Sequence, residues 1–295
     1  MRCSRMTDLQ TDRPKGASEM SIAVIIGVHD GVVLAADSAS TLTFTPPPVV
    51  ALPAGQQVVG NVYDNANKIF NLVKGQPIGC ITFGSGNIGN ASIGTLIKDL
   101  RKKLTDTPQE MEFDVEHYTM EGVAKILAKF LGAECDKLEQ PIKQNTNMGF
   151  LLGGYSKPGD LGESWSVEIQ MGVPQPPKKL RADHEVGLSW GGITEVIQRI
   201  IMGFSPQLFP ILAAVTQPPQ NPAVLASQLG PVLAAQLQAP LVFAPMPIQD
   251  VIDLARFLVH SAIMFSRFSP GPNMPTRPKR WPENAMSSRI SWCPS

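Results

Sequence analysis

The stretch SIAVIIGVHDGVVLAADSAS, residues 21–40, carries the clearest structural signal in this chain. Two runs rich in Val, Ile and Ala, residues 21–28 and 31–36, are separated by an Asp-Gly pair, which is a strong signal for a tight hairpin turn. The pattern predicts a buried β-hairpin. Because a small hydroxyl, Ser21, opens the first run and a carboxylate, Asp37, follows the second, the hairpin is expected to bring these two side chains together.

Beyond the hairpin, the apolar pattern alternates between the period of strands and that of helices. Strands are expected in NKIFNLV, PIGCITFGSG, NMGFLLGGY and SWSVEIQ. Apolar residues at helical spacing predict two helices between residues 93 and 131, and two more in ITEVIQRIIMGF and IQDVIDLARFLVHSAIMF. Runs of strands followed by runs of helices are typical of a layered α+β domain. A four-layer αββα sandwich, with helices outside two stacked sheets, suits this order.

Four segments interrupt or flank the predicted domain, which spans residues 21–275. Residues 1–20 are polar, lack the apolar core of a secretory signal, and are interpreted as a leader or propeptide. Residues 39–60 are expected to form a Pro-rich surface loop, because proline cannot pair within a central strand. Residues 205–247 are interpreted as an insertion of short helical segments. Residues 276–295 are basic and lack apolar periodicity, so they are either a disordered terminus or a frameshifted or mis-spliced end that replaces a final strand.

The composition argues against a nucleic-acid-binding, membrane-spanning, disulfide-rich or zinc-binding protein. Lys and Arg together number 25, as do Asp and Glu, and this balance gives no global field that favours nucleic acid or an anionic membrane. No run reaches the roughly 18–20 consecutive apolar residues of a membrane span. The four cysteines are scattered, without the spacing of a disulfide framework or a zinc site, and Cys80 and Cys135 are expected in the core. We therefore expect a cytoplasmic protein without a metal.

The hairpin segment, together with NANKIFNL and IGCITFGSG, resembles the start of proteasome-type β subunits and of their bacterial two-component relative. These belong to the N-terminal nucleophile hydrolase superfamily. When the chain is aligned with that family on Asp37, the family nucleophile falls on Ser21 without a gap. The family lysine matches Lys68 if the loop at residues 39–60 is an insertion, and the oxyanion glycine matches Gly84.

This resemblance implies a chemistry in which the N-terminal residue carries its own base. The α-amine, with a reference pKa of about 7.7–8.0, takes the proton of the hydroxyl. The same resemblance implies that Asp37 orients Lys68 and forms an ion pair with it. It also implies that Lys68 adjusts the proton affinity of the amine and hydroxyl of Ser21. The backbone N–H of Gly84 stabilises the oxyanion of the tetrahedral intermediate.

The chain departs from the family pattern at three places. The nucleophile is Ser21 where proteasome-type peptidases use threonine, and the preceding residue is Met20 where a self-processing site usually has glycine. If translation starts at Met20, removal of the methionine exposes Ser21; otherwise a propeptide must be cut there. The late D-x-x-S motif of active subunits falls on residues 266–269, which lack the aspartate and keep Ser269 as a site residue.

The resemblance implies a threonine-type-like endopeptidase that acts on peptides or unfolded proteins inside a homo-oligomeric ring. It implies no cofactor and leaves room for an ATPase partner. Two other interpretations stay open. One is a non-catalytic structural subunit, in which Ser21, Asp37 and Lys68 are only a strand-start hydroxyl, a turn carboxylate and a surface cation. The other is a small-molecule amidase of the same superfamily.

Overall fold

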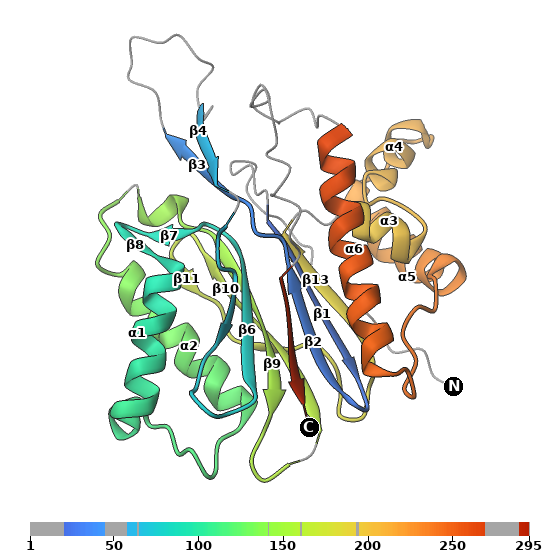
Figure 1. Ribbon diagram of the computed structural model, residues 1–295. Helices are drawn as coiled ribbons and strands as arrows, with labels where there is room; N and C mark the ends of the chain where they lie inside the picture. Colours follow the sequence, from blue (N-terminus) through green and yellow to red (C-terminus); the bar gives the residue numbers. More distant parts are fainter. Residues whose placement is uncertain are drawn as a thin grey trace. The chain divides into compact units, whose positions relative to one another are not determined.

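The computed structural model describes residues 21–44, 58–63, 65–140, 142–159, 161–192, 195–268 and 289–294. These residues form a mixed α+β fold with antiparallel sheets and six α-helices in the described part of the chain (Figure 1). They fall into two compact units, of which residues 195–241 make the smaller. The predicted α+β class is confirmed.

The first sheet of the larger unit contains the predicted hairpin. Its strand order is β13-β1-β2-β14, and all neighbours are antiparallel. The bounds are β1 Ile22–Val28, β2 Gly31–Ala36, β13 Gly187–Gly192 and β14 Arg289–Pro294. Strands β1 and β2 pair directly across the Asp-Gly turn, with Val28 opposite Gly31. Nearly every residue of the two strands is buried, so the prediction of a buried hairpin is confirmed.

The second sheet follows the order β11-β10-β9-β6-β5, with β12 also pairing to β10. Its main strands are β5 Ile69–Asn71, β6 Ile78–Gly84, β9 Met148–Tyr155 and β10 Gly162–Gln170. Two short strands, β11 Val173–Pro174 and β12 Lys178–Lys179, lie at its edge. The four main strands coincide with the four apolar runs in which strands were expected, which confirms those predictions.

Helices cover the two sheets of the larger unit. Helix α2 (Met120–Cys135) packs on β9 and β10, α1 (Ile93–Asp106) contacts β5 and α2, and α6 (Ile248–Phe268) lies on β1 and β2 (Figure 1). The side chains of Ser92 and Thr119 cap the first turns of α1 and α2 by accepting backbone N–H bonds. One apolar cluster fills the space between α1, α2 and the second sheet, and another lies between the two sheets.

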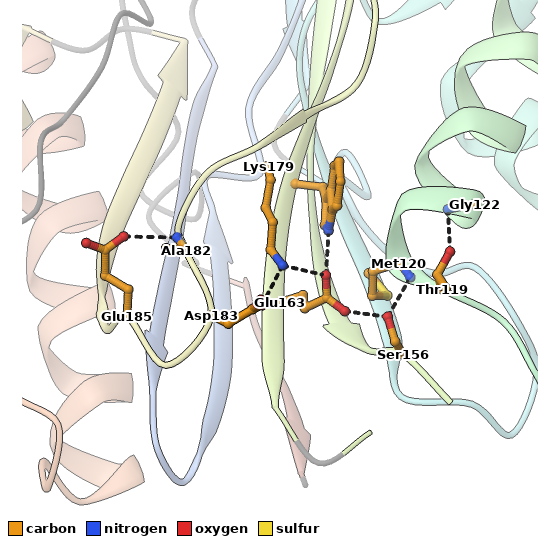
Figure 2. Close-up of polar contacts among 10 residues, drawn as sticks. Thr119, Met120, Gly122, Ser156, Glu163, Lys179, Ala182, Asp183 and Glu185 are labelled. Atoms are coloured by element: carbon orange, nitrogen blue, oxygen red, sulfur yellow. Dashed lines mark hydrogen bonds and ion pairs between the residues drawn. The ribbon is translucent and has the colours of Figure 1, made fainter. Parts of the chain in front are cut away.

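A carboxylate in the second sheet fixes the start of α2. The Ser156 hydroxyl donates to Glu163 and accepts from the backbone N–H of Met120, the first residue of the helix (Figure 2). The other oxygen of Glu163 accepts from the Trp165 indole at 3.0 Å and pairs with Lys179 at 3.3 Å. Because each polar group of this half-buried network has a partner, it connects helix and sheet without an unpaired charge.

The smaller unit contains α3 (Glu195–Met202), α4 (Leu208–Val215) and α5 (Pro222–Leu237). Its own core is small, with Phe209, Ala213 and Leu225 buried. The rings of Phe204 and Phe209 meet edge to face, with their centroids 5.9 Å apart. Helices therefore occupy most of the segment in which short helical pieces were expected.

Two segments differ from the sequence-based expectations. Within the expected loop at residues 39–60, β3 (Ser40–Phe44) pairs with β4 (Val58–Tyr63) in a separate two-stranded sheet, while residues 45–57 lie outside the described part. The loop prediction was wrong for the flanking residues, because the proline restriction acts only where prolines occur. Within the expected irregular tail, residues 289–294 form β14, which pairs with the free edge of β2.

Two glycines in the second sheet allow the sheets to approach each other. A Cβ atom at Gly153 would lie 2.7 Å from Cγ1 of Val32, and one at Gly162 would lie 2.8 Å from its Cγ2. Both distances are well below ordinary van der Waals contact. Val32 of β2 therefore fits into a hollow above β9 and β10 that exists only because these positions have no side chain.

We expect Gly153→Ala to lower the free energy of unfolding by about 1–3 kcal/mol, because the added methyl overpacks the space that Val32 fills. Gly27→Ala is the matched control, since its Cβ would meet the nearest atom, in Arg181, at an ordinary 3.7 Å. Urea denaturation of both variants measures the difference. Adding Val32→Ala to Gly153→Ala should recover part of the loss, and an equal effect of the two glycine substitutions would contradict this account.

Candidate active site

Ser21 lies immediately before β1, and Asp37 immediately after β2, at the same end of the hairpin. The antiparallel pairing of β1 and β2 continues past the end of β2, because the backbone N–H of Asp37 donates to the carbonyl of Ile22 at 3.3 Å. In return, Oδ1 of Asp37 accepts from the N–H of Ile22 at 2.7 Å, and Oδ2 accepts from the N–H of Ala39 at 3.0 Å. These bonds hold the carboxylate in one orientation beside Ser21.

Lys68 completes the cluster from a third part of the chain. It precedes β5, and its carbonyl accepts from the backbone N–H of Thr82 in β6 at 3.0 Å. Its Nζ donates to both carboxylate oxygens of Asp37 at 2.8 Å and to Oγ of Ser21 at 3.2 Å. An ammonium has three protons to donate, so these three contacts use its full capacity.

Burial sets the electrostatics of this cluster. The exposed fractions of Ser21, Asp37 and Lys68 are 8%, 3% and 7%. Removal from water lowers the pKa of Lys68 below the ordinary lysine value, and the Asp37 carboxylate opposes this by raising it. A lysine whose pKa is lowered while it contacts a hydroxyl is suited to accept the proton of that hydroxyl.

Gly192, which the sequence did not indicate as a site residue, lies against the backbone of Ser21. Gly192 of β13 pairs with Ile22, and its φ of 86° is in the left-handed region. A Cβ atom at this position would lie 1.8 Å from the carbonyl oxygen of Ser21. Only glycine fits this close approach. The Gly-Gly pair at the end of β13 is the signal in the sequence that could have indicated it.

Gly84 ends β6 with a φ of 90°, a conformation that favours glycine. The next residue, Ser85, donates its backbone N–H to the carbonyl of Asn147 at 2.9 Å. The described contacts thus join Ser21, Asp37 and Lys68 in one cluster and do not join Gly84 to it. Ser269 lies outside the described residues.

The described residues contain no group of three or more His, Cys, Asp or Glu side chains that could hold a metal ion. Cys80 and Cys135 are fully buried, as expected, and burial raises the pKa of both thiols, that of Cys135 to about 11. None of the helices in the described part has the length and apolarity to cross a membrane.

Known proteins resemble this chain in structure. No protein-family model matches the sequence, and no curated protein matches it. The solved structure of Anbu (ancestral beta-subunit) from Yersinia bercovieri aligns with 92% of this chain and 81% of its own, with a TM-score of 0.50 and 12% sequence identity. At this identity the likeness shows the fold alone. The fold is proteasome-like.

We expect Lys68→Met to lower the free energy of unfolding by about 3–5 kcal/mol, because it leaves the Asp37 carboxylate buried without its cation. The double variant with Asp37→Asn should regain part of this loss, since the unpaired charge is then gone. Urea denaturation of both single variants and the double variant measures the coupling. A Lys68→Met variant as stable as the unaltered protein would contradict a buried charged pair.

Proposed function

We propose that this chain is a proteasome-like peptidase of the N-terminal nucleophile hydrolase type, with Ser21 as its nucleophile. The observation that carries the proposal is the contact of Ser21 Oγ with Lys68 Nζ at 3.2 Å, inside a buried cluster charge-balanced by Asp37. A serine that only begins a strand would not require a buried lysine beside its hydroxyl. A buried lysine in contact with both a hydroxyl and a carboxylate is the arrangement of an activated nucleophile.

The proposed reaction begins with transfer of the Ser21 proton to the neutral form of Lys68, whose lowered pKa makes that form accessible. The oxygen then attacks the peptide carbonyl, and the C–N bond breaks as the proton passes to the leaving amine. Water hydrolyses the resulting ester and regenerates Ser21. Asp37 keeps the Lys68 ammonium in place during the charged stage, and the backbone N–H of Gly84 is proposed to donate to the oxyanion.

The position of Ser21 in the chain adds a condition to this mechanism. Its nitrogen is bonded to Met20 in the full sequence, so the α-amine becomes available only when residues 1–20 are removed or not made. A free α-amine would then be a second base beside the hydroxyl. In this proposal the released chain is the active form, and Ser269 belongs to the same site by resemblance alone.

The proposal extends to the architecture and setting of the protein. The order of helices, two facing sheets and helix α6 in the larger unit supports a four-layer αββα sandwich (Figure 1). By resemblance, we propose a homo-oligomeric cytoplasmic ring that degrades peptides or unfolded proteins, with substrates delivered by an ATPase. A family member that kept the fold without catalysis would retain the same layers but would not need the Ser21–Lys68 contact.

We expect a β-lactone to acylate Ser21, because an activated hydroxyl opens the strained ring to form an ester. Mass spectrometry of the protein purified after expression of the whole sequence should find the adduct on a peptide that begins at Ser21, the N-terminus of the released chain. Ser21→Ala should abolish labelling and peptide hydrolysis, whereas Ser166→Ala, which removes another buried hydroxyl, should not. An unlabelled chain that already begins at Ser21 would favour the structural subunit, whereas an unlabelled chain that begins at Met1 would be an unprocessed precursor. Labelling with hydrolysis of small amides alone would favour the amidase.

We expect the rate of acylation to rise with pH as Lys68 loses its proton, with a midpoint below the ordinary lysine pKa because burial lowers it. Asp37→Asn should move this midpoint to lower pH, since the carboxylate that raises the pKa of Lys68 is removed. Asp114→Asn, at an exposed carboxylate far along the sequence, is the control. A midpoint that does not move in Asp37→Asn would exclude Lys68 as the proton acceptor.

A further inference from the structure

Phe83 of β6 extends into the space between the two sheets. Its side chain is 5% exposed and belongs to the apolar cluster that lies between them. Among the described residues of this cluster it is the one aromatic side chain, and the others are aliphatic. Because a packed interior is nearly incompressible, the size of this ring helps to set how far apart the sheets lie at this point.

The ring of Phe83 lies against two glycines that belong to different sheets. Gly149 of β9 pairs directly with Phe83, and a Cβ atom at Gly149 would lie 2.2 Å from Cζ of the ring. Gly191 of β13 belongs to the first sheet, and a Cβ atom there would lie 2.4 Å from Cε1 of the same ring. Both distances are far below van der Waals contact. The ring therefore fills room that both glycines leave, and it spans from one sheet to the other.

The backbone on each side of this ring leads to one member of the Ser21–Lys68 contact. In the second sheet, the N–H of Thr82, the residue before Phe83, donates to the carbonyl of Lys68 at 3.0 Å. In the first sheet, the residue after the supporting glycine is Gly192, at which a Cβ atom would lie 1.8 Å from the carbonyl oxygen of Ser21. The segments that carry the lysine and the serine are thus connected through Phe83.

We propose that Phe83 is a positioning residue for the Ser21 site. Its ring sets the separation of β6 and β13 and thereby holds Oγ of Ser21 at hydrogen-bonding distance from Nζ of Lys68. Phe83 acts through the backbones of these two strands, because a close-packed interior transmits a change in spacing to its neighbours. The inference rests on the proposed function, in which that contact activates the nucleophile.

Comparison of Phe83→Leu with Phe150→Leu tests this proposal. Phe150 of β9 is the matched control, since it is fully buried in the cluster between α1, α2 and the second sheet. The rate of acylation of Ser21 is measured against the concentration of β-lactone, with the protein purified after expression of the whole sequence. Phe83→Leu should lower the maximal rate about tenfold to a hundredfold, because a small displacement of a reacting group has effects of this size. The concentration that gives half of that rate should change little, and Phe150→Leu should change neither quantity.

A size exchange across the sheets separates spacing from a general loss of packing. Gly191→Ala in the Phe83→Leu background adds a methyl group where the ring has been removed, so it should restore part of the maximal rate. The same alanine in the Phe150→Leu background meets the intact Phe83 ring and should lower the rate. If the alanine restores no activity to Phe83→Leu, a role in spacing is contradicted.

The outcomes distinguish this inference from the proposed function. An unaltered protein that begins at Ser21 and is not labelled would contradict the peptidase proposal alone. Crystal structures then decide on Phe83, since the distance from Ser21 Oγ to Lys68 Nζ, 3.2 Å here, should exceed hydrogen-bonding distance in Phe83→Leu and not in Phe150→Leu. Equal distances, or equal rates of acylation in the two variants, would overturn the positioning role and leave the peptidase proposal standing.

Circular dichroism of each variant establishes that it is folded. If Phe83→Leu does not fold, Phe83→Met takes its place, because methionine is close in volume and costs less stability. Methionine is flexible and does not hold a fixed separation as a ring does. The maximal rate should therefore fall in Phe83→Met as well, by less than in Phe83→Leu, and Phe150→Met is its control. Equal rates in these two methionine variants would overturn the proposal.

Discussion

The buried ion pair of Lys68 and Asp37 joins three parts of the chain that are separate in sequence. Asp37 holds the end of the β1–β2 hairpin through backbone bonds, while Lys68 immediately precedes β5 of the second sheet. Neither charge is stable in the interior without the other, because desolvation of a single ion costs several kcal/mol. The two sheets are thus connected at the point where Ser21 lies, and the position of its hydroxyl follows from this pairing.

The structure also depends on glycines that allow segments of the chain to approach each other closely. Gly192 permits β13 to pass against the carbonyl of Ser21, and Gly153 permits Val32 to fill the space between the sheets. Side chains at these positions would separate the strands that hold the cluster in place. The geometry of the Ser21 site therefore depends on residues that have no chemistry of their own.

The two units of the chain differ in how they are stabilised. The larger unit buries charged and polar groups in paired networks, as around Asp37 and Glu163. The smaller unit has a core of only a few side chains and exposes aliphatic side chains on α4 and α5. Ser21, Asp37 and Lys68 all belong to the larger unit.

The hairpin, the four main strands of the second sheet and the set of Ser21, Asp37 and Lys68 could be predicted from the sequence, because they depend on local periodicity and on a short motif. It did not determine the pairing of β13 and β14 with the hairpin edges, the β3–β4 sheet, or the contact of Gly192 with Ser21. Those features depend on which backbone edges and hollows remain free once the chain has folded. They arise only in the folded chain, because residues far apart in sequence then compete for the same space.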